Sequence, residues 1–280
     1  MKSGALPNKV PRLTFFAFGS LLTISCGSLA IWLSGGSSAM AIGNLVGWGI
    51  GLVAASAILV IPKIPKAAEI VFAVMIVALA ATFADRGLSG VNRWITIGPL
   101  RANIAALLLP VFVAILCARQ TRPSFAAPVW LSAISLLVAQ PDASQATALA
   151  IAAPLLFSNW PSKWRWPVLV ATATLAAISW LRPDPLQPVA EVEGIIKLMW
   201  QISPVLAAMG LAALAATIIA VRRADISAAA LSAYCAVVAV ISAFGHFPVP
   251  LAGSGISFPL GWWLGIAIVL RSHPNDEAKT

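Results

Sequence analysis

Residues 182–193 contain the side chains best suited to acid–base chemistry. Asp184 lies in the proline-rich stretch Arg-Pro-Asp-Pro-Leu-Gln-Pro, whose prolines restrict the backbone, and Glu191 and Glu193 follow it. Lys197 lies four residues after Glu193, the spacing at which opposite charges pair favourably on a helix. A carboxylate beside a lysine can also remove a proton from a hydroxyl group when its pKa suits that task. Structural pairing and proton transfer are both open interpretations of Glu193 and Lys197.

Residues 89–101 combine two arginines, Arg93 and Arg101, with Trp94 and two glycines. A guanidinium group binds phosphate in a bidentate manner, so both arginines are candidates for binding an anionic headgroup. The alternative is a structured re-entrant turn in which Trp94 lies at the level of the lipid headgroups and the arginines contact lipid phosphates.

Gln140-Pro141-Asp142 interrupts two apolar runs. A carboxylate at the end of a membrane helix is costly unless it is paired or hydrated, which makes Asp142 a candidate substrate-binding residue. Because Asp142 directly precedes an expected helix, it could instead cap the exposed N–H groups of that helix.

Residues 245–257 form an uncharged segment rich in glycine and proline. Irregular backbone at membrane depth is tolerated only against protein or a polar cavity, so this segment could close a groove for a lipid substrate. We interpret His246 as an interfacial hydrogen-bonding group, and the three cysteines, which lie in apolar stretches, as small buried hydrophobic residues. The sequence contains no metal-binding pattern, nucleophile elbow, phosphate loop or dinucleotide fingerprint, so we expect no bound metal.

The composition indicates which elements must position these residues. Of the 280 residues, 60% are hydrophobic and only 10% are charged, whereas soluble domains carry about 25% charged residues. This excludes an ordinary soluble globule, a disordered chain and a nucleic-acid binder. The net charge of +9 is therefore better explained by membrane topology than by a nucleic-acid partner.

The apolar windows predict an all-α, polytopic transmembrane protein of about ten helices. Residues 1–280 are expected to form a single multi-pass domain without a separate soluble domain. The expected helices are 13–33, 40–61, 67–84, 102–118, 126–139, 143–157, 167–181, 194–221, 226–245 and 257–270.

The distribution of cations predicts that both termini are cytoplasmic. With this orientation, most of the 18 Lys and Arg residues lie in cytoplasmic segments, as the positive-inside rule requires. The four chemically unusual segments then all face outward. The cations left on the outer side are Arg86, Arg93, Arg101, Arg182 and Lys197.

At these four segments the sequence resembles the SEDS family of cell-shape and cell-division membrane proteins, the RodA/FtsW-type glycosyltransferases. Residues 90–99, Gly-Val-Asn-Arg-Trp-Ile-Thr-Ile-Gly-Pro, are similar to the family's G-x-x-R-W-I-x-L-G-P loop. Gln140-Pro141-Asp142 with Thr147-Ala148-Leu149 is similar to its Q-P-D-x-G-T-A-L motif, and residues 245–257 are similar to the loop before its last helix.

The sequence also departs from the family pattern. The family's Q-P-S-E-x-x-K after Gly-Pro is replaced by Arg101-Ala-Asn-Ile-Ala-Ala, and the outer loop before Glu193 is shorter. In that loop the family has an H-T-D-F-I-F-like segment whose Asp is the presumed catalytic base. The nearest match, Glu191-Val-Glu-Gly-Ile-Ile, places Glu193 at that position.

The resemblance implies a bacterial inner-membrane protein of peptidoglycan synthesis that engages a polyprenyl-pyrophosphate-linked sugar, such as lipid II, at the outer leaflet. Glu193 would act as general base, and Arg93, Arg101, Asp142 and Lys197 would contact substrate. No cofactor is expected, apart from a divalent cation that the pyrophosphate could carry. A single-span transpeptidase is the expected protein partner.

Whether the chain is an enzyme stays open at the level of sequence. A non-catalytic scaffold for a division or elongation complex would fit the shortened loop. A lipid-precursor flippase or other transporter is a third class, although such a protein would need ionisable groups across the bilayer, and here they lie near the helix ends.

Overall fold

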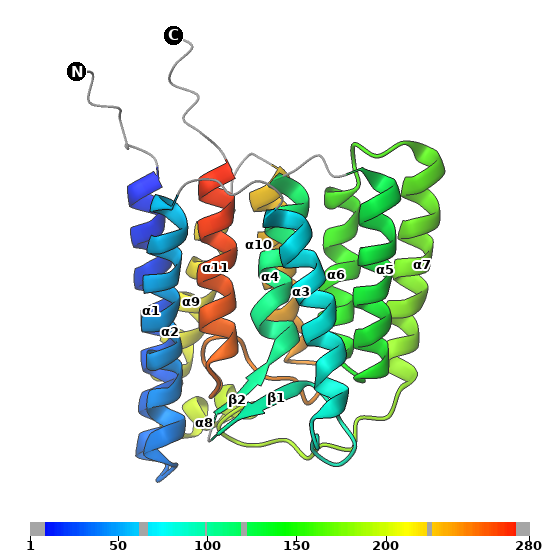
Figure 1. The fold of residues 1–280 in the computed structure, drawn as a ribbon. Coiled ribbons are helices and arrows are strands. Elements are labelled where there is room, and N and C mark those ends of the chain that lie inside the picture. The colour runs from blue at the N-terminus through cyan, green and yellow to red at the C-terminus, as the bar shows by residue number, and fades with distance from the viewer. Residues whose placement is uncertain (1–8, 62–66, 99, 119–121, 223–225, 273–280) are drawn as a thin grey trace, which may run out of the picture.

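Long apolar helices run side by side and alternate in direction between the two ends of the molecule (Figure 1). The computed structural model describes residues 9–61, 67–98, 100–118, 122–222 and 226–272. The helices are α1 (Lys9–Leu33), α2 (Ser38–Val60), α3 (Ala67–Ala81), α4 (Ile104–Ala118), α5 (Pro123–Ala139), α6 (Ala143–Leu156), α7 (Ser162–Leu181), α8 (Ile195–Ile202), α9 (Pro204–Val221), α10 (Ile226–Ile241) and α11 (Ser257–Ser272).

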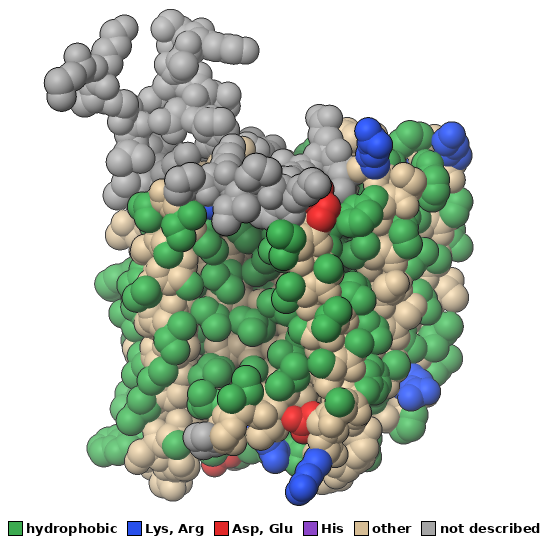
Figure 2. Space-filling model, in the orientation of Figure 1, with side chains coloured by type: hydrophobic (Ala, Val, Ile, Leu, Met, Phe, Trp, Pro, Cys, Tyr) green, Lys and Arg blue, Asp and Glu red, His purple; other side chains and the backbone are tan. Residues whose placement is uncertain are grey.

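This arrangement confirms the predicted all-α, polytopic membrane architecture. Within the described ranges, three segments are long and apolar enough to cross a bilayer by length and composition alone: Pro11–Leu33, Ser38–Val60 and Pro204–Val221. Figure 2 shows a hydrophobic band around the visible face, with charged side chains gathered toward the two ends. Such a band matches the apolar interior of a bilayer flanked by its polar headgroups.

The predicted helix 194–221 is divided into α8 and α9, which is one difference from the sequence-based expectation. Ser203 has an extended backbone, with φ −161° and ψ 122°, and Pro204 begins α9. Proline lacks an N–H group and disfavours helical geometry in the residue before it, so the break falls at this pair. The Ser203 side chain caps α9 by accepting a hydrogen bond from the Leu206 N–H at 3.4 Å.

A short hairpin is the second difference, because residues 89–101 were expected to be a loop and residues 102–118 a helix. Strands β1 (Trp94–Ile97) and β2 (Leu100–Asn103) pair antiparallel, with Trp94 opposite Asn103. Gly98 adopts φ +60° at the turn, a conformation that glycine accepts without strain. The Asn103 Oδ1 then accepts a hydrogen bond from the Ala106 N–H, which caps the start of α4.

Helices distant in sequence pack together in the core. The first two helices contact the last part of the chain, α1 against α9 and α2 against α11, and α4 and α11 pack together as well. A second group is formed by α5, α6 and α7, and α10 joins it through α6. The hairpin, the α5–α6 turn, the α7–α8 connection and the segment before α11 therefore join helices of a bundle in which the N-terminal and C-terminal helices are adjacent.

Candidate functional site

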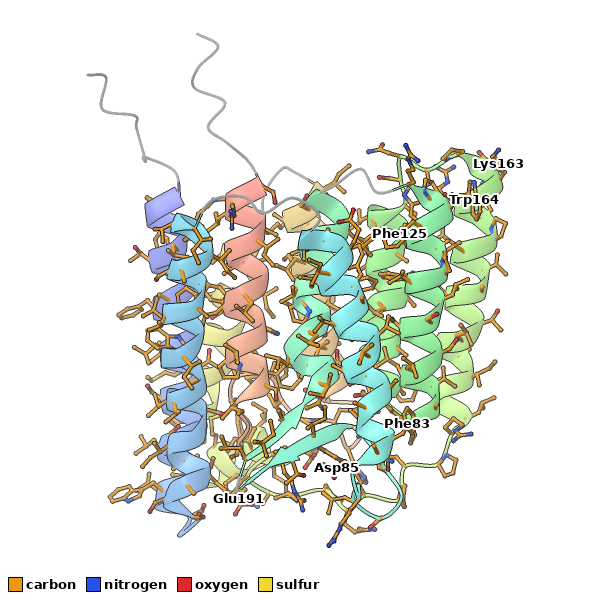
Figure 3. All side chains as sticks on the ribbon, viewed as in Figure 1. Phe83, Asp85, Phe125, Lys163, Trp164 and Glu191 are labelled. Carbon is orange, nitrogen blue, oxygen red and sulfur yellow. The ribbon has the colours of Figure 1, made fainter. Side chains whose placement is uncertain are left out.

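The structure brings all four chemically unusual segments to the same end of the helix bundle. The hairpin, the α5–α6 turn, the α7–α8 connection and the segment before α11 lie at the lower end in Figure 1. Figure 3 shows Asp85 and Glu191 at that end and Lys163 and Trp164 at the opposite one. The sequence-based expectation that these segments share one side of the membrane agrees with this placement.

Arg93 forms the centre of this end. Its side chain is only 4% exposed. The Nη2 group donates hydrogen bonds to the Pro141 carbonyl and, at 2.5 Å, to Asp184 Oδ2, while Nε donates to the Gln140 carbonyl at 3.3 Å. Asp142 Oδ2 lies 3.9 Å from Nε. A single guanidinium thus joins three connecting segments.

The position of Arg93 differs from the outward-facing phosphate ligand that the sequence suggested. A guanidinium group has five N–H donors in a fixed fork, and here several of them bind protein oxygen atoms. Because the Arg93 side chain is only 4% exposed, direct binding of a headgroup would require the surrounding segments to move apart. In this geometry the contacts of Arg93 hold the α5–α6 turn and the α7–α8 connection next to the hairpin.

Asp142 caps α6, one of the two interpretations that the sequence left open. Its Oδ1 accepts hydrogen bonds from the Gln145 N–H at 3.3 Å and from the Ser144 hydroxyl at 2.9 Å, while its other oxygen faces Arg93. With its side chain 4% exposed, this carboxylate is compensated by a cap and a cation rather than by water.

Gln140 anchors the same turn to the end of α3, a role that the sequence analysis did not assign to it although it named the Gln140-Pro141-Asp142 motif. Its Nε2 donates to the Leu79 carbonyl at 2.9 Å and to the Thr82 hydroxyl at 2.7 Å, and both polar side chains are fully buried. A buried amide at the end of an apolar run was the available signal, because such a group requires a polar partner nearby.

Glu193 lies in a tight turn immediately before α8. The N–H groups of Val192, Glu193 and Gly194 all donate to the Val189 carbonyl, and the Val189 N–H donates to Glu193 Oε2 at 2.9 Å. Partial burial raises the pKa of the Glu193 carboxyl above its ordinary value, although the Val189 hydrogen bond and the charge of Arg93 oppose this rise. A carboxyl with a raised pKa is a stronger base once it is ionised.

The expected helical pairing of Glu193 with Lys197 is absent among the described residues. Because α8 begins only at Ile195, Glu193 lies ahead of the helix and the i,i+4 geometry does not apply. Lys197 is exposed on α8, and Arg101 is exposed on β2. These two cations remain accessible at the same end of the bundle, outside the Arg93 cluster.

The segment before α11 packs directly against the turn that carries Glu193. The Val249 N–H donates to the Val192 carbonyl at 3.4 Å, and the Ser254 N–H donates to the Glu191 carbonyl at 2.8 Å. A Cβ atom at Gly253 would lie 2.4 Å from the Val192 oxygen, so only glycine permits this approach. The irregular backbone thus lies against protein.

Asp85 supports the hairpin and was also missed in the sequence. The Thr96 N–H donates to Asp85 Oδ2 at 2.8 Å, and this hydrogen bond holds the pKa of the Asp85 carboxyl below its ordinary value.

In the part of the chain that the structure describes, no three His, Cys, Asp or Glu side chains gather in a group that could hold a metal ion. Of the site residues predicted from the sequence, Arg101 and Lys197 are exposed and Glu193 is partly exposed, whereas Arg93 and Asp142 are buried.

Comparison with known proteins identifies the fold. No protein-family model and no curated protein matches the sequence. The crystal structure of the rod shape determining protein RodA from Thermus thermophilus is similar over 91% of this chain and 94% of its own, with a TM-score of 0.65 and 18% identity. A mutant of the same RodA gives a TM-score of 0.62, again at 18% identity, with 91% of this chain and 95% of the mutant covered.

A structure of a peptidoglycan synthase complex, concerned with how polymerization and crosslinking are coordinated, is also similar. It covers 91% of this chain and 96% of its own, with a TM-score of 0.61 and 16% identity. In each comparison the likeness covers more than nine-tenths of both chains. The chain therefore has the fold of the rod shape determining protein RodA.

Proposed function

We propose that this chain is a shortened, divergent SEDS-family protein of the bacterial inner membrane that takes part in peptidoglycan synthesis. The observation that carries the proposal is the RodA fold over 91% of the chain. The four sequence segments that resemble the family's motifs, gathered at one end of the bundle, support it. Its substrate class is a polyprenyl-pyrophosphate-linked sugar bound at the outer leaflet.

In this proposal Glu193 is the general base. Its carboxylate takes the proton of an acceptor sugar hydroxyl, whose oxygen attacks the anomeric carbon of the donor sugar. The bond from that carbon to the pyrophosphate oxygen breaks, and the polyprenyl pyrophosphate leaves with the bonding electrons. The raised pKa of Glu193 supports this role because a base is most effective when its pKa approaches the working pH.

The exposed cations Arg101 and Lys197 attract the pyrophosphate and offset the charge that develops as it leaves. Arg93 and Asp142 contribute indirectly, because their mutual contact and the Asp184 ion pair hold the surrounding segments in place. This division differs from the expectation that all four groups touch substrate.

The test is polymer formation by the protein reconstituted in liposomes with a lipid-linked disaccharide. We expect Glu193→Ala to lower the rate of polymerisation by about 100-fold or more, the contribution typical of a general base. Glu191→Ala is the matched control, because Glu191 lies two residues away and contributes its backbone carbonyl to Ser254. Unchanged polymer from Glu193→Ala would reject the assigned base.

A non-catalytic scaffold is the second candidate. It is favoured by the burial of Arg93, whose side chain is only 4% exposed and donates hydrogen bonds to protein oxygen atoms. The scaffold proposal expects co-purification with a single-span transpeptidase and no polymer from the wild-type chain under conditions in which an active polymerase control produces it.

A further inference from the structure

Asn44 is a fully buried amide in the second turn of the apolar helix α2, and its hydrogen bonds go to one distant segment. That segment, residues 242–256 between α10 and α11, is called here the α10–α11 loop. Asn44 Nδ2 donates to the Leu251 carbonyl at 3.0 Å and to the Gly253 carbonyl at 2.7 Å. Asn44 Oδ1 accepts from the Gly255 N–H at 2.6 Å. One side chain therefore fixes three alternate residues of the loop.

The loop conformation that Asn44 holds is an unusual one. Leu251 adopts φ +65°, the left-handed region that a branched side chain rarely occupies, and such residues persist only where their surroundings hold them. The Ala252 carbonyl lies so close to α1 that a Cβ atom at Gly27 would be 2.1 Å from it. The Ser254 hydroxyl donates to the Met40 carbonyl at 3.1 Å. Helices α1 and α2 thus both contact the loop, α1 by close packing and α2 by hydrogen bonds.

The opposite side of the same loop contacts the turn that carries Glu193. The Val249 and Ser254 N–H groups donate to the carbonyls of Val192 and Glu191, the two residues just before Glu193. The loop lies between Asn44 and the Glu193 turn, and hydrogen bonds connect it to both. A change in the loop backbone at residues 251–255 would therefore act on the Glu191–Val192 backbone that directly precedes Glu193.

We propose that Asn44 is a positioning residue for Glu193, acting through the α10–α11 loop. The amide sets the path of residues 251–255, these residues set the position of the Glu191–Val192 backbone, and that backbone fixes how deeply the Glu193 carboxylate is buried. This inference rests on the proposed function, in which Glu193 is the base. The inference adds that polymerisation requires Asn44, a residue of α2 that makes no contact with substrate.

Asparagine is chemically suited to this task. It offers two N–H donors and a carbonyl acceptor on a short side chain, which matches two carbonyls and one N–H of the loop. Alanine would leave all three loop groups without a partner in a buried setting, so the loop backbone would rearrange to find others.

The experiment measures polymerisation as a function of pH for reconstituted wild type, Asn44→Ala and Ser20→Ala. Ser20→Ala is the matched control, because Ser20 accepts a hydrogen bond from Trp48 Nε1 at 2.9 Å between α1 and α2, away from the loop. We expect Asn44→Ala to lower the maximal rate by about 10- to 100-fold, since misplacement of a reacting group by about 1 Å costs on this order. The substrate KM should change little.

The pH profile distinguishes positioning from loss of folded protein. Burial raises the pKa of the Glu193 carboxyl, and the charged groups whose fields reach it are Arg93, ahead of β1, and Asp184, in the same connection. Release of the turn would hydrate Glu193 and lower its pKa, so the acidic limb of the Asn44→Ala profile should move to lower pH. A rate reduced by the same factor at every pH, as destabilisation alone would give, overturns the proposal.

Amide hydrogen exchange provides a readout that does not need activity. In Asn44→Ala, exchange should accelerate both in peptides that contain 249–255 and in those that contain 189–194, and Ser20→Ala should leave the second group unchanged. Slow exchange at 189–194 in Asn44→Ala overturns the coupling even if the proposed function holds. Faster exchange at 189–194 in Asn44→Ala, together with no polymer from the wild-type chain, would instead reject the proposed function alone.

A second variant applies if Asn44→Ala does not fold. Asn44→Asp retains the acceptor for the Gly255 N–H and, in its ionised form, loses both donors to Leu251 and Gly253. The same shift of the acidic limb and the same exchange at 189–194 are expected, and their absence in a folded Asn44→Asp protein contradicts the proposal.

Discussion

Single side chains hold the outward end of this molecule together through buried polar contacts. The sequence singled out Arg93 as a candidate ligand for an anionic headgroup and Asp142 as a candidate substrate-binding residue or helix cap. It did not predict their partners, because the Arg93–Asp184 contact spans 91 residues and depends on how α7 returns toward the hairpin. The Glu193–Lys197 pairing, one of the two interpretations that the sequence left open, does not form among the described residues, because α8 starts two residues after Glu193.

Replacing Arg93 tests whether its buried contacts stabilise this end of the molecule. We expect Arg93→Ala to lower the free energy of unfolding by about 3–5 kcal/mol, because Asp142 would remain buried without its cation. Arg101→Ala, which removes an exposed arginine from the same end, should change it by less than about 0.5 kcal/mol. Denaturant unfolding in detergent micelles gives both values, and equal losses in the two variants would contradict a supporting role for Arg93.

The helices and their connections were predicted more completely than the site. The apolar windows located the spanning segments, and Pro204 carried the signal for the break between α8 and α9, although the apolar composition on either side outweighed it. The hairpin could not be predicted, because its strands are only four residues long and depend on Asp85 and Gly98 for their geometry.

Glycines in α1 and α2 give a matched test of how closely these helices approach the α10–α11 loop. Gly27→Ala should destabilise the protein, because the new Cβ would lie 2.1 Å from the Ala252 oxygen. Gly43→Ala meets no atom within 4 Å, so it should stabilise α2 by up to about 1 kcal/mol through helix propensity alone. Thermal unfolding measures the two changes in stability. If both substitutions change the stability in the same direction, the close approach of the loop to α1 does not determine the effect of Gly27→Ala.

The whole molecule has two chemically different ends, and the sequence predicted that division from its cations. The structure agrees that the four unusual segments share one end, since helices alternate in direction along the chain. The orientation of the termini stays a prediction, because the direction of insertion depends on the membrane rather than on packing.

Cysteine labelling decides the orientation. In a chain whose native cysteines are replaced, Arg86→Cys and Gln187→Cys, both at exposed positions of the hairpin end, should react with an impermeant maleimide added outside intact cells. Lys163→Cys, exposed at the opposite end, should react only after permeabilisation. Labelling of Arg86→Cys and Gln187→Cys from opposite sides would separate the segments and refute a shared outer site.

The contact between Asn44 and a loop more than 200 residues later has a consequence for biosynthesis. At about 5–20 residues per second, a ribosome needs roughly 10–40 s to make the intervening chain. During that interval the nascent α2 exposes an amide with no partner in the bilayer, where unsatisfied polar groups are costly. Chains truncated before Leu251 would lack all three partners of Asn44 and keep this defect permanently, so cells should remove them quickly.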